Sequence, residues 1–145
     1  MLFRSAAVIG GIAGVLVIES VFFVERKLKL DDPVGAISVH GVCGTFGVLC
    51  VGIFANGSYG GGWNGSPVKG VEGIIKGEWG QLGAQALGVA AIWTVCLGVA
   101  YAFFKIQDKV SKAMGKGGIR SREEDEINGL DLPEMGVEAY PEFSK

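Results

Sequence analysis

Long apolar runs separated by short polar stretches dominate the pattern of this 145-residue sequence. Three of these runs reach the length of roughly 20 predominantly apolar residues that a transmembrane helix needs. The three runs cover residues 5–24, 34–55 and 82–104. The first contains one charged side chain, Glu19, and the other two contain no Asp, Glu, Lys or Arg. The pattern therefore predicts an all-α membrane protein, with three transmembrane helices in residues 1–104 and a polar tail over residues 105–145.

Capping residues mark the ends of the second and third predicted helices. Asp32 is suited to cap the second helix at its N-terminus, and Pro33 suits the first helical position. The pair Asn56-Gly57 follows the end of the same helix. Lysines follow the third apolar run, which fits the end of a helix at the lipid headgroups.

Basic residues are unevenly distributed between the two sides of the predicted membrane. Three spans place the loop over residues 25–32 and the tail on one side, and the N-terminal segment with Arg4 and the loop over residues 56–81 on the other. The short loop and the tail as far as Arg122 carry nine Lys and Arg residues, whereas the opposite side carries three. The positive-inside rule therefore predicts a multi-pass protein of the plasma membrane with a cytoplasmic tail and with Trp63 outside.

The composition excludes several other classes of protein. Gly contributes 25 residues and 49% of residues are hydrophobic, which does not fit a disordered chain. The net charge of −2 gives no reason to expect nucleic acid as a partner. Three cysteines lie in apolar runs without a second Cys or a His at metal-ligand spacing: Cys43, Cys50 and Cys96. The sequence predicts no metal site, no cofactor and no disulfide, and without a nucleophile–base arrangement it predicts no enzyme.

His40, the one histidine of the chain, is the main candidate for chemistry. An ionisable side chain inside a transmembrane helix is costly, and such a residue is a functional hypothesis by default. Gly44 and Gly47 follow on the same helical face and leave room beside the imidazole. A neutral imidazole both donates and accepts hydrogen bonds, so it could pass a proton or hold a small polar solute. From these residues alone, a hydrogen bond between helices is as plausible as a role in transport.

Two long motifs resemble the ammonium transporters of the Amt/Mep family. The run Asp31-Asp-Pro-Val-Gly-Ala-Ile-Ser-Val-His40-Gly-Val-Cys-Gly44 is similar to the tenth transmembrane helix of that family. The run Gly129-Leu-Asp-Leu-Pro-Glu-Met-Gly-Val-Glu-Ala-Tyr140 is similar to its cytoplasmic tail. Between them, Phe54-Ala-Asn-Gly and the Trp63-x-Gly65 loop also fit, and the third apolar run resembles the eleventh helix. The resemblance covers nearly the whole chain, in order.

The resemblance implies a homotrimer in the lipid bilayer, with ammonium or ammonia passing through one pore in each subunit. His40 matches the second of two histidines that line this pore, and Gly44 and Gly47 would pack beside it. In the family, aromatic rings recruit ammonium at an outer vestibule, where it is deprotonated. The paired histidines then assist the passage of ammonia and of the proton.

The tail motif carries a second set of expectations. Its turn formers and its aromatic anchor favour a folded segment that docks on the cytoplasmic face and on the neighbouring subunit. These residues are Gly129, Asp131, Gly136 and Tyr140. By resemblance, a PII-type signal protein is a further expected partner at this face.

The family has eleven spans, of which this chain resembles the last three. The first pore histidine and the aromatic vestibule belong to earlier helices, so we expect the chain to be the C-terminal part of a longer transporter. The alternative is a non-transporting membrane assembly or regulatory module that associates with full-length subunits.

Overall fold

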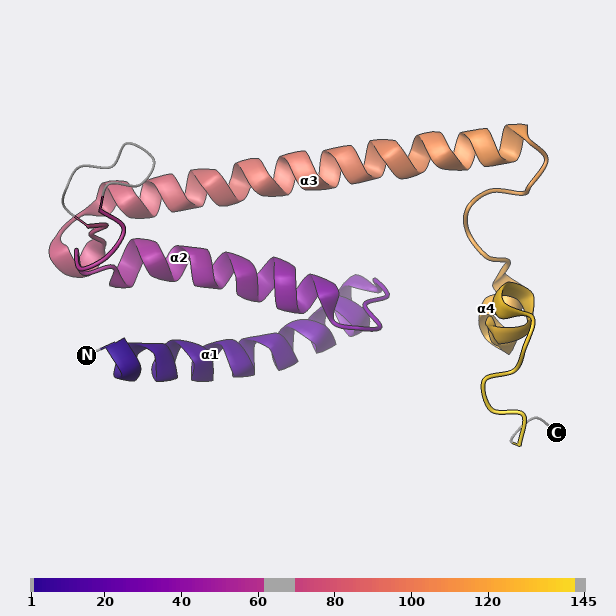
Figure 1. Cartoon of the computed structure of the whole chain (residues 1–145), viewed down its shortest axis with the longest axis horizontal. Coiled ribbons are helices and arrows are strands. Elements are labelled where there is room, and N and C mark those ends of the chain that lie inside the picture. Colours follow the sequence, from indigo (N-terminus) through magenta and orange to yellow (C-terminus); the bar gives the residue numbers. More distant parts are fainter. Residues whose placement is uncertain (1, 62–69, 143–145) are drawn as a thin grey trace. The chain divides into compact units, whose positions relative to one another are not determined.

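The computed structural model describes residues 2–61 and 70–142, and these residues are mostly helical. Three long helices are followed by two short helices in the tail (Figure 1). The long helices are α1 (Leu2–Phe23), which continues into the π-helical turn η1 (Val24–Leu28), the π-helical segment η2 (Ile37–Cys43) followed by α2 (Gly44–Phe54), and α3 (Trp79–Ala113). The short elements are the 3₁₀ turn η3 (Ile74–Lys76), α4 (Glu123–Asn128) and the π-helical turn η4 (Asp131–Met135).

The prediction of three helices able to cross a membrane is confirmed. Three helical stretches are long and apolar enough to do so: Ser5–Leu28, Ile37–Phe54 and Trp79–Ala113. Their ends differ from the predicted ones. The last stretch runs past Phe104 to Ala113, because the lysine-rich start of the predicted tail consists of good helix formers.

The second helix begins later than predicted. Gly35 has a φ of +65°, a conformation that glycine adopts at little cost, and it ends a turn in which its N–H bonds the Asp32 carbonyl at 2.8 Å. The helix therefore begins only after this turn, and Pro33 lies in the turn rather than at the first helical position. Asp32 still caps the helix, but its carboxylate reaches forward to the amides of Ile37 and Ser38.

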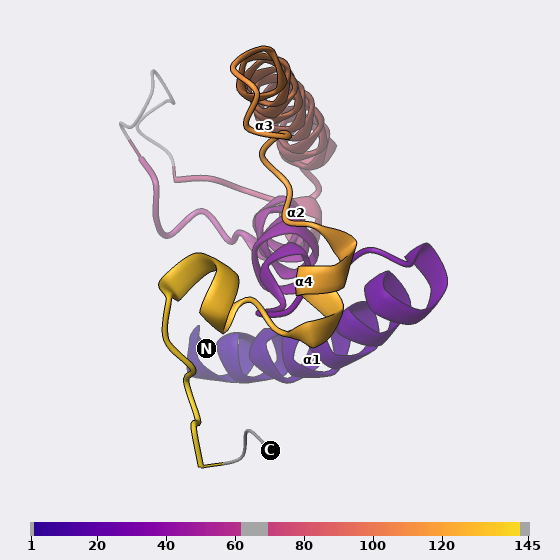
Figure 2. The same ribbon diagram turned by 90° about the vertical axis from the view of Figure 1, so that its right-hand side faces the viewer.

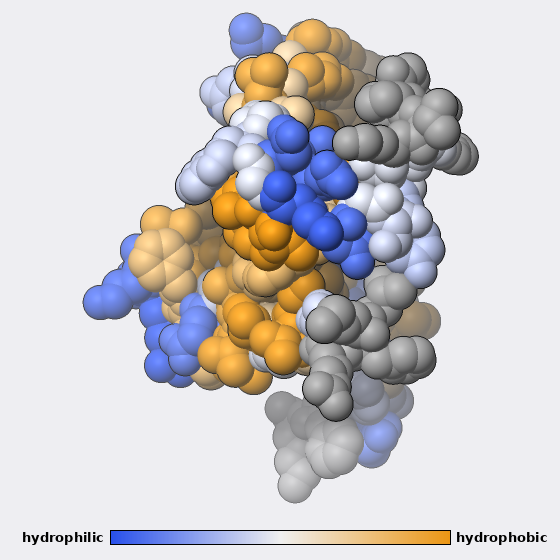
Figure 3. Space-filling view, turned by 90° about the vertical axis from the view of Figure 1, so that its left-hand side faces the viewer, coloured by the Kyte–Doolittle hydropathy of each residue, from blue (hydrophilic) through white to orange (hydrophobic). Residues whose placement is uncertain are grey.

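The chain divides into two compact units, Met1–Thr94 and Val95–Lys145. In the first unit α2 lies between α1 and the first half of α3 (Figure 1). Among the described residues, Val24 and Cys50 are the only hydrophobic side chains that are buried. Apolar side chains instead cover much of the surface (Figure 3), as expected for helices that face lipid or other helices.

The described parts of the loop between α2 and α3 fold against each other. An isolated antiparallel bridge joins Asn56 to Glu72, and the Val71 N–H bonds the Tyr59 carbonyl at 2.7 Å. A Cβ on Gly70 would lie 2.6 Å from that carbonyl oxygen, so only glycine fits here. Trp63, which we predicted to be external, lies outside the described residues.

Candidate functional site

His40 lies in the π-helical segment η2, where one extra residue widens the helical turn. Its side chain is exposed in this chain, as are Gly44 and Gly47 further along the same face. A Cβ built on either glycine meets no atom within 4 Å in the described part of the structure. His40, Gly44 and Gly47 are therefore all open to whatever surrounds this helix, and their shared role beside a pore stays a prediction. π-helical turns of this kind occur frequently at functional sites.

Different glycines make the close contacts between the helices. A Cβ on Gly52 would lie 2.6 Å from the Leu82 Cα of α3, and one on Gly41 would lie 3.0 Å from the Trp93 ring. We had expected packing at Gly44 and Gly47, and that expectation stays a prediction about helices outside this chain. Gly41 and Gly52 are the positions where a bare backbone lets α3 approach.

A buried polar network fixes the start of the His40 helix, and the sequence analysis did not find it. The Ser20 hydroxyl of α1 donates to the Ser38 hydroxyl at 3.0 Å, and the latter donates to the Asp32 carboxylate at 3.3 Å. The same carboxylate accepts the amides of Ile37 and Ser38 at 3.1 and 3.2 Å. Ser38 is completely buried, and His40 follows two residues later. The network thus joins α1 to the segment that carries His40.

The charge of Asp32 suits this position. Burial opposes ionisation, but the hydrogen bonds from Ile37 and Ser38 outweigh it and hold the pKa of Asp32 below its ordinary value of 3.8. A carboxylate at a helix N-terminus is also stabilised by the helix dipole. The folded state therefore prefers ionised Asp32 more strongly than the unfolded state does. The stabilisation that results is present above pH 3.8 and is lost as the pH falls through the lowered pKa.

We predict a pH-dependent protection of the first amides of η2. Hydrogen exchange followed by NMR should show the Ile37 and Ser38 amides protected above pH 3.8 and progressively unprotected below it, after correction for intrinsic exchange rates. Asp32→Asn should lower this protection and remove its pH dependence, whereas Asp31→Asn, on the exposed neighbour, should change neither. Equal protection in the wild type and in Asp32→Asn at all pH values would disprove the capping role.

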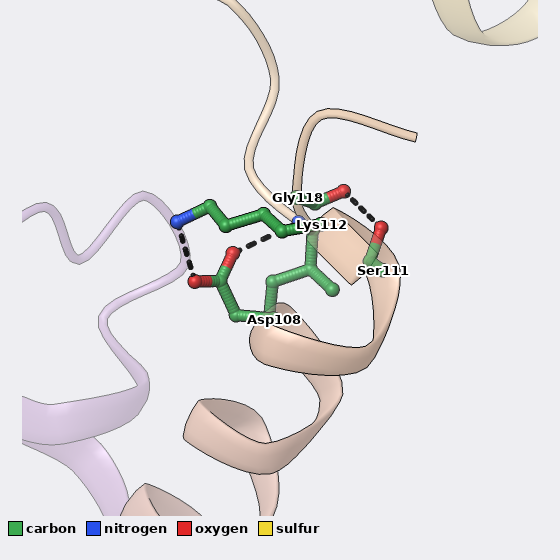
Figure 4. Close-up of polar contacts among 5 residues, drawn as sticks. Asp108, Ser111, Lys112 and Gly118 are labelled. Carbon is green, nitrogen blue, oxygen red and sulfur yellow. Dashed lines mark hydrogen bonds and ion pairs between the residues drawn. The ribbon is translucent and has the colours of Figure 1, made fainter. Parts of the chain in front are cut away.

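In the second unit, polar contacts hold the first residues of the tail against the end of α3. Asp108 accepts a hydrogen bond from the Ile119 amide at 3.3 Å and pairs with Lys112 at 2.7 Å, while the Ser111 hydroxyl donates to the Gly118 carbonyl at 2.8 Å (Figure 4). Gly118 has a φ of +122°, which favours glycine. These bonds fold the chain after α3 back onto the last turn of the helix.

The predicted docking residues of the tail lie in and beside its two short helices, which form separate coils (Figure 2). Gly129 and Gly136 follow α4 and η4 and have φ values of +109° and +72°, so both end a helix in a conformation that favours glycine. Asp131 accepts a hydrogen bond from the Ala139 amide at 3.2 Å, and Tyr140 is exposed. The tail is therefore folded as expected, and its docking on a partner stays a prediction.

Two further contacts hold the tail together. The Arg120 guanidinium donates two hydrogen bonds of 3.0 Å to Glu126 and holds the pKa of that carboxyl below its usual range. The Ser121 hydroxyl donates to Glu134 at 2.7 Å, which ties the segment before α4 to η4. Over residues 2–61 and 70–142, no three His, Cys, Asp or Glu side chains are placed to hold a metal ion.

Comparison with known proteins finds relatives that match almost the whole chain. Ammonium transporter Amt2 of Archaeoglobus fulgidus is 40% identical over 139 residues, which are 96% of this chain and 28% of that protein. Ammonium transporter Amt1 of Haloferax mediterranei is 34% identical over 94% of this chain and 22% of its own length. The ammonium transporter of Bacillus subtilis is 30% identical over 94% of this chain and 30% of its own length. No solved structure matches the chain.

The chain thus spans less than a third of the length of these relatives. The family match itself covers residues 3–140, which include the three long helices, the open His40 face and the tail motif. A chain with three membrane-length helices that matches one family from end to end is a multi-pass membrane protein of that family. It belongs to the Ammonium Transporter Family.

Proposed function

We propose that this chain works in the transport of ammonium across the membrane, as the part of a transporter that supplies one pore-lining histidine. The observation that carries the proposal is the family match over residues 3–140, within which His40 lies on an open helix face. The relatives are named as ammonium transporters, which favours transport over a non-transporting regulatory module and over an enzyme.

The open face has suitable chemistry for a pore. A cation in a narrow apolar path pays a large desolvation penalty, whereas neutral ammonia pays far less. An imidazole that offers one donor and one acceptor can hydrogen-bond ammonia and hand on a proton. Gly44 and Gly47 leave the space next to His40 free of side chains, so other helices of the transporter can complete the wall of the path.

The remaining parts of the proposal concern assembly and placement. The transporter is a homotrimer in the plasma membrane, and its exposed apolar helix faces are covered by lipid, by earlier helices and by neighbouring subunits. The tail lies in the cytoplasm and docks there through its folded segment. A PII-type signal protein is the candidate partner at this face.

A chimeric transporter tests the proposed function. This chain replaces the matching C-terminal segment of Ammonium transporter Amt2 from Archaeoglobus fulgidus, to which it is 40% identical. In cells that lack ammonium transporters, we expect the chimera and the parent to restore growth on low ammonium. The chain alone should not restore growth, because its three helices cannot enclose the family's pore without the helices that carry the other histidine and the aromatic vestibule. A correctly inserted, trimeric chimera that conducts no ammonium would contradict the proposal.

Labelling of single cysteines tests the predicted orientation. On a background without Cys43, Cys50 and Cys96, we expect a membrane-impermeant reagent added outside to label a cysteine at position 63 and not one at position 112. The expectation follows from the excess of Lys and Arg on the side of the tail. External labelling of a cysteine at position 112 in intact cells would contradict the predicted orientation.

A further inference from the structure

Trp93 of α3 contacts the His40 helix at two points. Its indole N–H donates to the Thr45 hydroxyl at 2.9 Å. The six-membered part of the ring lies on the bare backbone of Gly41, where a Cβ would be 3.0 Å from Cη2 and 3.1 Å from Cζ2. One indole thus holds both the residue that follows His40 and a residue one turn later.

These two points lie on opposite sides of a change in helix geometry. Gly41 belongs to the π-helical segment η2, whereas Thr45 lies in the first turn of α2. A π-helical turn holds one residue more than an α-helical turn, so moving or losing it rotates the flanking parts of the helix by about one residue, or about 100°. The register of η2 therefore decides whether His40 shares a face with Gly44.

A second close contact keeps Trp93 in place along the helix. Leu82 of α3 packs on Gly52 near the other end of α2. A Cβ on Gly52 would lie 2.6 Å from the Leu82 Cα. The pairs Gly52–Leu82 and Gly41–Trp93 are equally far apart along both helices, which run antiparallel. Sliding of α3 would break both contacts at once, so the indole stays opposite the end of η2.

We propose that Trp93 is a positioning residue for His40: by binding Gly41 and Thr45 together, the indole fixes the register of η2 and aims the imidazole along the face of Gly44 and Gly47. The proposal rests on the proposed function, because the direction of His40 matters for a pore. Trp93 contacts Gly41 and Thr45, which each follow the His40 face by one residue, or about 100°, so the indole acts through the helix and not through the imidazole itself.

NMR of the complete chain in lipid nanodiscs tests this proposal. His40 is the only histidine, so ¹⁵N-labelled histidine gives ring signals from that residue alone. Trp93→Phe keeps an aromatic ring but removes the N–H donor, and Thr45→Val removes the acceptor while keeping the side-chain shape. We expect both variants to shift or split the His40 ring signals and the Gly44 amide signal. The double variant should do no more than Trp93→Phe alone, because both changes remove the same hydrogen bond.

The controls separate positioning from stability. Trp79→Phe changes an exposed tryptophan of the same helix, and Thr94→Val removes a hydroxyl that bonds only its own helix at Ala90, so neither should move the His40 signals. If Trp93→Phe prevents folding, Thr45→Val alone decides the question. Unchanged His40 ring signals in folded Thr45→Val, with the Trp93 indole signal shifted, would overturn the proposal. The measurement requires no transport, so its outcome is distinct from failure of the growth test.

Discussion

His40→Ala should abolish or redirect conduction in the chimeric transporter while leaving the trimer folded. The imidazole is exposed, and within the described residues it makes no hydrogen bond or ion pair. Removing it takes away the donor and acceptor that the proposed path needs, and we expect the ammonium-driven current or the discrimination against other cations to change by about tenfold or more, which corresponds to about 1.4 kcal/mol. A purely structural hydrogen bond between membrane helices would instead cost about 0.6–2 kcal/mol of stability.

Current and trimer stability are to be measured on the same preparation. Val39→Ala is the matched control, because it shortens the exposed side chain next to His40 without touching a polar group. We expect this control to retain the current of the parent chimera. A well-folded His40→Ala trimer with unchanged current and selectivity would reduce His40 to a surface residue of the helix.

The three helices and the family could be predicted because both depend on long stretches of sequence. Apolar runs of membrane length identify a span whatever surrounds them, and the motif around His40 is long enough to identify a family. α-Helical periodicity also predicts that His40, Gly44 and Gly47 share a face. It did not reveal the π-helical geometry of η2, on whose register that shared face depends.

Contacts between distant residues could not be predicted in the same way. The forward reach of Asp32 depends on the turn at Gly35, and a bond from Ser20 to Ser38 depends on how α1 meets η2. Serines in apolar runs were the one available signal, because a buried hydroxyl needs a partner. The sequence names no partner, so the network became visible only in three dimensions.

The glycines illustrate the same limit and lead to the second large effect. Gly47 and Gly52 are both interior glycines of α2, and their sequence surroundings are similarly apolar. Only the neighbouring helix, α3, distinguishes them. Nothing lies within 4 Å of a Cβ on Gly47, whereas a Cβ on Gly52 would lie 2.6 Å from the Cα and 3.1 Å from the amide nitrogen of Leu82. A backbone cannot move aside as the end of a flexible side chain can.

Gly52→Ala should therefore separate α2 from α3 and destabilise the chain by about 1–3 kcal/mol, the usual cost of overpacking. Gly47→Ala has the same gain in helix propensity without the clash, so we expect it to be neutral or slightly stabilising in the isolated chain. An SDS titration of the chain in mixed micelles, followed by circular dichroism, compares the two unfolding midpoints. The Trp93 indole N–H signal reports on α3 directly, because its bond to Thr45 should weaken in Gly52→Ala and persist in Gly47→Ala. Equal midpoints and an unchanged indole signal in both variants would show that α3 does not pack on Gly52.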